Sequence, residues 1–106
     1  MAEARPSVDV LLAVARADFA RRLPAKTAEI EKLVSASAWE EARRAAHKLR
    51  GSAATYGFPA LGEAAAAIED ALLAAGGAPD AQVFARVREI LRGACLEAER
   101  CAREAS

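Results

Sequence analysis

The sequence contains one histidine, His47, and residues that could support chemistry at its ring lie close to it in the chain. Around it, small and apolar side chains recur at spacings of four and three residues, as on one face of a helix: Ala42, Ala46, Leu49, Ala53 and Tyr56. At about 100° per residue, His47 lies more than about 100° from the centre of this face. We therefore expect its imidazole to face solvent near the middle of a helix.

The helix surface around His47 is expected to be rich in cations. The residues within about 60° of it on the helix are Glu40, Arg43, Arg44, Arg50, Gly51 and Ala54. Nearby cations favour a neutral, nucleophilic imidazole and offset the charge of a phosphoryl group that arrives at a ring nitrogen. Gly51 removes bulk beside the ring, at a cost to the helix of about 1 kcal/mol relative to alanine. Two alternatives stay open here: an ordinary solvated histidine, and a glycine that relieves packing between helices.

Composition bounds the class of protein. The chain has 106 residues, enough for one domain, and its 15 basic residues are balanced by 15 acidic ones, which leaves no global charge to attract nucleic acid or an anionic membrane. No apolar run approaches the roughly 20 residues of a membrane-spanning helix, and the N-terminus has no signal-peptide core. Cys95 and Cys101 point in different directions from one helical segment, which disfavours a disulfide between them. The presence of one histidine and no CxxC motif argues against a zinc site. We expect a cytoplasmic, reduced protein without a metal.

The N-terminal third carries an apolar-periodic stretch that a proline interrupts. We predict a helix over residues 7–22, then a break or kink at Pro24, because the residue before a proline avoids helical dihedral angles. The helical pattern continues to about residue 35. Residues 1–6 are predicted to form a flexible tail, and residues 7–104 a single domain.

Start and stop signals define the remaining helices. Ser37 and Glu40 have the spacing of a capping box and predict a helix start. Gly57 suits a left-handed helix end, and Pro59 suits the first position of the next helix. Asp80 is predicted to cap the last helix. Because the connections are short, we predict an all-α, up-down antiparallel four-helix bundle with an additional N-terminal helix or a kinked first helix.

A longer pattern surrounds the histidine: the residues from Ala46 to Phe58 read AHKLRGSAATYGF. This segment resembles the histidine-phosphotransfer (HPt) domain family, whose hallmark is His-x-Leu-Lys-Gly-Ser-Ala with a second glycine ten residues after the histidine. Gly57 fills that second position. The end of the segment is also similar to the phosphotransfer domains of chemotaxis-type kinases. Arg50 is a departure, because the family usually has lysine there; arginine keeps the charge but presents a planar fork.

The resemblance implies a role in a phosphorelay. The histidine, here His47, would accept a phosphoryl group from an aspartyl phosphate on a receiver domain, or from a kinase, and pass it to a receiver aspartate. Arg50 would help to hold the phosphoryl oxygens, and Gly51 would leave room for the receiver. Further cations expected to share the first task are Lys48, Arg43 and Arg44. The implied partners are a response-regulator receiver domain, which would carry Mg²⁺, and a histidine or hybrid kinase; no cofactor is expected on this chain.

The resemblance also singles out Glu69. It matches the position at which chemotaxis-type domains carry a glutamate that hydrogen-bonds the phospho-accepting ring. Such a bond would fix the tautomer and leave the other ring nitrogen free to attack. Ala66 stands where those domains have an accompanying histidine, so that part of the network is missing here. The alternative for Glu69 is a surface salt bridge to Arg44 or Arg50.

Docking of a partner is expected to use apolar surface beside the histidine. Ala54 and Phe58 are the candidates, although Phe58 could equally belong to the core. We expect a monomeric phosphoryl-transfer intermediate without autonomous catalytic activity. The alternative is a non-catalytic helical module that binds a receiver or kinase without phosphotransfer. An enzyme that uses His47 as a general base is disfavoured, because no nucleophile lies near it at helical spacing.

Overall fold

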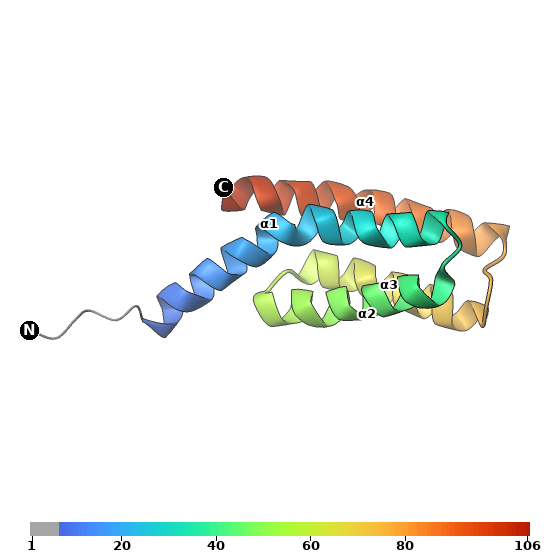
Figure 1. Ribbon diagram of the computed structural model, residues 1–106, viewed down its shortest axis with the longest axis horizontal. Helices are drawn as coiled ribbons and strands as arrows, with labels where there is room; N and C mark the ends of the chain where they lie inside the picture. Colours follow the sequence, from blue (N-terminus) through green and yellow to red (C-terminus); the bar gives the residue numbers. More distant parts are fainter. Residues whose placement is uncertain (1–6) are drawn as a thin grey trace, which may run out of the picture.

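The computed structural model describes residues 7–106, which form four helices. In Figure 1 successive helices run in opposite directions. The helices are α1 (Val8–Ser35), α2 (Trp39–Tyr56), α3 (Pro59–Ala75) and α4 (Ala81–Ala105). Each helix packs against its neighbours in the chain, and α4 returns to pack against α1. No strand occurs in this part of the chain, so the all-α prediction is confirmed. The tail predicted for residues 1–6 lies outside the described residues.

The core of the bundle is built largely from small side chains. Of the nineteen apolar side chains buried in the described part of the chain, seven are alanine. The stripe predicted on α2 is buried at Ala42, Ala46, Leu49 and Ala53. Between α2 and α3 the backbones come close, because a Cβ added at Gly62 would lie 3.7 Å from the Cβ of Ala53. Small residues at this contact therefore determine how near α3 lies to α2, the helix that contains His47.

The separate N-terminal helix is a prediction that the structure does not support. One helix, α1, continues through Pro24. Proline cannot donate a backbone hydrogen bond and bends a helix. Helix α1 nevertheless stays packed against the core before and after Pro24, since Leu23 and Thr27 are fully buried. The Thr27 hydroxyl donates to the carbonyl oxygens of Leu23 and Pro24 at 3.1 Å each. In Figure 1 the N-terminal part of α1 runs at an angle to the rest, which corresponds to the kinked alternative.

The capping box predicted from Ser37 and Glu40 is wrong. Helix α2 begins at Trp39, and no side chain caps its first turn. Ser37 instead adopts a left-handed conformation with φ 59° and ends α1. Its backbone N–H bonds to the carbonyl of Val34, and the next N–H bonds to that of Leu33, which is the Schellman pattern of a helix end. A three-residue connection uses the serine to stop one helix, so the serine cannot also start the next.

The later helix ends follow the sequence signals. Gly57 ends α2 in the left-handed region with φ 80°, and Pro59 is the first residue of α3. The Asp80 side chain accepts a hydrogen bond of 2.9 Å from the backbone N–H of Val83 and caps α4. These three predictions are confirmed. The turn at Gly57 sets the direction in which α3 returns along α2.

The conformation of Ser37 leads to a stability prediction. Ser37→Gly removes the Cβ that makes a left-handed conformation costly, and should raise the free energy of unfolding by about 0.5–1 kcal/mol in urea. A capping serine at the start of α2 would give the opposite sign, because its loss destabilises a helix. Gly57→Ala is the matched control at a second left-handed position, and should lower the free energy of unfolding by about 1 kcal/mol.

Candidate functional site

His47 lies near the middle of α2 with its side chain turned away from the core. The side chain is 70% exposed, whereas Ala46 is completely buried. The helical periodicity predicts this orientation, and the structure confirms it. The backbone on both sides of His47 is helical over the whole of α2, so the ring is mounted on a rigid element.

Glu69 of α3 contacts the ring of His47 from its buried side. Its Oε2 lies 2.7 Å from Nδ1 of His47. Among the described residues Glu69 is the only buried charged side chain, with 5% of its surface exposed. An ionised carboxylate only accepts hydrogen bonds, so Nδ1 carries the proton and donates. In the neutral ring, Nε2 therefore keeps its lone pair on the exposed side.

Two arginines offset the buried charge of Glu69. Nη1 of Arg50 donates to Oε1 of Glu69 at 3.2 Å, and Nη1 of Arg43 lies 3.8 Å from Oε2. The two alternatives for Glu69, a bond to the ring and a salt bridge to an arginine, thus occur together. The arginine is Arg50 and not Arg44. A carboxylate buried in this way is stabilised only when its neighbours satisfy both oxygens, as they do here.

Arg43 and Arg44 are also paired with Glu40 at the start of α2. Arg43 donates to both oxygens of Glu40, at 2.7 and 3.1 Å, and Nε of Arg44 lies 3.3 Å from Oε1. The hydrogen bond from Arg43 lowers the pKa of Glu40, and the same bond raises the pKa of Arg43. The cationic surface expected around His47 is therefore partly neutralised by carboxylates. The Arg44 side chain stays 67% exposed and that of Arg50 51%, so both heads remain accessible.

Gly51 and Ala54 extend the exposed face of α2 beyond His47. A Cβ added at Gly51 would meet no atom within 4 Å, so this glycine does not relieve packing between helices. Ala54 is exposed and lines a shallow groove of about 400 Å³ between α2 and α3. Arg50 and Ala66 line the same groove. The surface next to the ring is thus open, and small side chains lie beside Arg50 on it.

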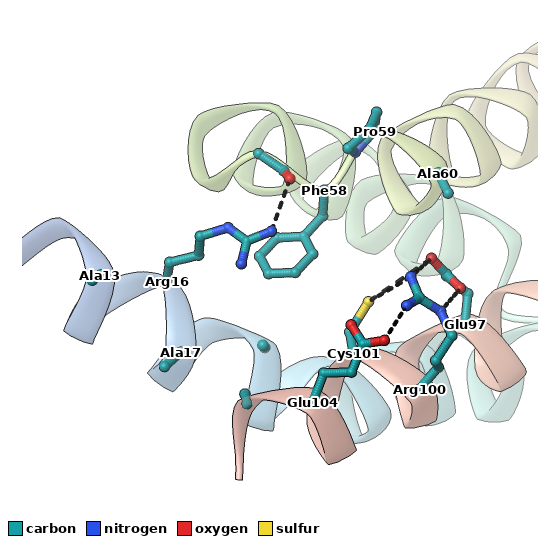
Figure 2. Close-up of a pocket in the computed structure, with 13 residues that line it drawn as sticks. Ala13, Arg16, Ala17, Phe58, Pro59, Ala60, Glu97, Arg100, Cys101 and Glu104 are labelled. Atoms are coloured by element: carbon teal, nitrogen blue, oxygen red, sulfur yellow. Dashed lines mark hydrogen bonds and ion pairs between the residues drawn. The ribbon is translucent and has the colours of Figure 1, made fainter.

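Two predicted site residues lie elsewhere. Lys48 lines a different groove, of about 560 Å³, between α1 and α2, and is not brought to Glu69. Phe58 is only 7% exposed, with its ring centroid 5.7 Å from that of Phe19, so it belongs to the core, the alternative stated for it, although it also lines the groove beside Ala54. The guanidinium of Arg16 covers the Phe58 ring at 4.2 Å from its centroid (Figure 2). The tight turn after Gly57 points this side chain inward.

The family comparison agrees with this geometry. Residues 14–104 match the family model described as Hpt domain. The chain belongs to the Hpt domain family. Hpt domains are helical bundles that carry out histidine phosphotransfer in phosphorelays and generally interact with receiver domains and kinases. No match to this Hpt domain is found among curated proteins or among solved structures.

The structure adds two acidic residues, Glu40 and Asp70, to the site predicted for the Hpt domain. Glu40 bonds to Arg43 and Arg44 at the three- and four-residue spacings of helical ion pairs, so the sequence contains the signal for these two bonds. Asp70, whose Oδ1 lies 3.9 Å from Nη1 of Arg50, carried no such signal. Within residues 7–106, no three metal-ligating side chains cluster, and no helix is long and apolar enough to cross a membrane.

The bond between Glu69 and His47 predicts the tautomer of the ring. Nitrogen–proton correlation spectra of the neutral imidazole should show the proton on Nδ1. Glu69→Gln keeps an acceptor oxygen and should keep this form, whereas Glu69→Ala removes the acceptor and should shift the proton toward Nε2. Asp70→Asn is the matched control, because Asp70 is exposed and contacts Arg50 without touching the ring. A wild-type ring protonated mainly on Nε2 would contradict the assignment.

Proposed function

We propose that this Hpt domain is a phosphotransfer protein of a two-component phosphorelay. In this proposal His47 accepts a phosphoryl group from a receiver aspartyl phosphate, or from a histidine or hybrid kinase, and passes it to a receiver aspartate. One observation carries it: the buried Glu69 carboxylate binds Nδ1 and leaves Nε2 on a side chain that is 70% exposed. The cytoplasmic location expected from the sequence stays a prediction.

The chemical step is a direct displacement at phosphorus. The lone pair on Nε2 of His47 forms the N–P bond while the P–O bond to the donor aspartate breaks, and the electron pair leaves with that carboxylate. The ring becomes a cation that still carries its proton on Nδ1. Glu69 stabilises this charge through the bond it already makes, so little reorganisation is needed. Attack by a receiver aspartate on the phosphohistidine reverses the step.

The arginines take different parts in this proposal. Arg44 and Arg50 stand three residues before and three residues after His47 on α2, with exposed side chains, and would bind the phosphoryl oxygens by charge-assisted hydrogen bonds. Arg43 is only 25% exposed and bridges Glu40 and Glu69, so it would position the glutamate. The receiver would supply Mg²⁺ and the acidic pocket around its aspartate. This chain would contribute the nucleophile and no cofactor of its own.

The proposal is tested by transfer from a phosphorylated receiver to the protein. Wild type should gain one acid-labile, base-stable phosphoryl group, and His47→Gln should gain none, because the amide lacks a nucleophilic ring nitrogen. Mass spectrometry of the intact protein and of its peptides measures the gain. Tight binding of the receiver without any label on wild type would instead establish the non-catalytic interaction module.

The open surface at Gly51 predicts that access to the ring can be blocked without unfolding the bundle. Gly51→Leu should raise the free energy of unfolding by about 0.5–1 kcal/mol, because it adds helix propensity where no atom obstructs the side chain. It should slow phosphoryl transfer at least about tenfold by obstructing the receiver. Gly93→Leu in α4 is the matched control: a Cβ there also meets no atom within 4 Å, so it should stabilise similarly and leave transfer unchanged. Equal transfer rates in the two variants would contradict the predicted approach.

A further inference from the structure

Two exposed carboxylates lie beside the arginines of the site without touching the ring of His47. Oε1 of Glu40 lies 3.3 Å from Nε of Arg44, and Oδ1 of Asp70 lies 3.9 Å from Nη1 of Arg50. The side chains of both acids are more than half exposed. The two exposed arginines near the ring therefore each have an acid at ion-pair distance before any phosphoryl group arrives.

The stability of the fold does not account for these two acids. Ion pairs between exposed side chains contribute little to the free energy of unfolding. Within residues 7–106 the Asp70 carboxylate makes no hydrogen bond, and its 3.9 Å contact is longer than one. Glu40 has a second partner, because Arg43 donates to both of its oxygens, and this bond lowers the pKa of Glu40. Glu40 therefore stays ionised near neutral pH.

Both acids lie near the position that a phosphoryl group on the ring would occupy. Glu40 stands seven residues, or two turns of α2, before His47, so the two side chains leave the helix in nearly the same direction. Asp70 directly follows Glu69, whose carboxylate lies 2.7 Å from the ring. A phosphoryl group brings about two negative charges and three acceptor oxygens. The acids would repel this group and compete with its oxygens for the same arginines.

We propose that Glu40 and Asp70 determine how strongly this Hpt domain holds its phosphoryl group. While the ring is free, each acid pairs with one exposed arginine. When the phosphoryl group is bound, both arginines turn from their acids to its oxygens, and the acids are left unpaired beside a group of the same charge. The two acids thus make the phosphorylated state less stable and favour release to a receiver aspartate. This inference rests on the proposed phosphotransfer.

The charge of the whole site supports this role. Three arginines and three carboxylates form one group of ion pairs, which has no net charge: Arg43, Arg44, Arg50, Glu40, Glu69 and Asp70. With Glu69 as the only acid, the arginines would leave two positive charges, about the charge that a phosphoryl group offsets. Such a site would retain the group, whereas a relay has to release it. On release the N–P bond breaks, its electron pair returns to Nε2 of His47, and a P–O bond forms to the receiver aspartate.

The equilibrium of transfer between a phosphorylated receiver and the full chain tests this inference. Glu40→Gln and Asp70→Asn each remove one charge and keep the size of the side chain, and the glutamine keeps an oxygen for Arg43. Each variant should shift the equilibrium toward phosphohistidine about two- to fourfold at low salt. The double variant should multiply the two effects, because the acids contact different exposed arginines. Label on the two proteins, separated on a gel before hydrolysis depletes it, gives the equilibrium constant.

Three controls separate this effect from a change of fold or of overall charge. Glu41→Gln removes the same charge one residue from Glu40, but Glu41 points about 120° away from His47 and lines the groove between α1 and α2. It should shift the equilibrium less than either variant. Asp70→Glu keeps the charge beside Arg50 and should keep the wild-type equilibrium. Added salt at about 0.5 M should reduce the effects of Glu40→Gln and Asp70→Asn, because it screens exposed charges.

The outcomes distinguish this inference from the function on which it rests. Wild type that gains no label from the receiver refutes the phosphotransfer, and the role of the two acids with it. Labelled wild type, with Glu40→Gln and Asp70→Asn no different from Glu41→Gln, overturns the role of the acids and leaves the phosphotransfer standing. A shift toward the receiver in these two variants also overturns it, because the acids would then stabilise the phosphohistidine.

Discussion

The buried carboxylate of Glu69 is the constraint on which the site depends. Removing a carboxylate from water costs several kcal/mol unless hydrogen bonds and opposite charges offset the loss. Arg50, Arg43 and Nδ1 of His47 together provide that compensation, at 3.2, 3.8 and 2.7 Å. The contacts that stabilise Glu69 therefore also fix the orientation of the imidazole. The buried Glu69 thus determines which ring nitrogen of His47 remains exposed.

The carboxylate reaches the ring because α2 and α3 lie close together. At their contact Gly62 of α3, which adds no side chain, faces Ala53 of α2, and Ala46 of α2 and Ala65 of α3 are completely buried. Bulkier residues there would separate the helices, and the 2.7 Å bond between Glu69 and the ring would lengthen. The alanine-rich composition, which at the level of sequence only favours helix, therefore also sets the geometry of the site.

Features that depend on one helix alone could be predicted from the sequence. The buried stripe of α2, the exposure of His47, the end at Gly57 and the cap at Asp80 all follow from helical geometry and local backbone preferences. The pairing of Glu69 with the ring came from family resemblance, because 22 residues and a turn separate the two. Nothing in helical spacing determines which residue of a returning helix meets the ring.

The predictions that failed depend on how segments pack. Ser37 and Glu40 had the spacing of a capping box, but the short connection required Ser37 in the left-handed region to end α1. Phe58 lies near His47 in the chain, yet the turn after Gly57 buries it, which is the alternative stated for it. Lys48 lies about 100° from His47 around α2 and lines the groove with α1, and its part in phosphoryl binding stays a prediction. Angular position on the helix, and not distance along the chain, separates Lys48 from Arg50.

The unequal lengths of the helices separate the apolar end of α1 from the surface around His47. This end of α1 exposes Val8, Val10, Leu11, Leu12 and Val14. Helices α1 and α4 have 28 and 25 residues, against 18 and 17 for α2 and α3. The excess extends past the turn at Gly57, which lies ten residues, or about 15 Å, along α2 from His47. A receiver that approaches the ring over Gly51 and Ala54 meets α2 and α3, whereas the apolar end of α1 lies beyond that turn. Arg16 of α1 donates to the carbonyls of Tyr56 and Gly57, so the same turn also joins the end of α1 to α2.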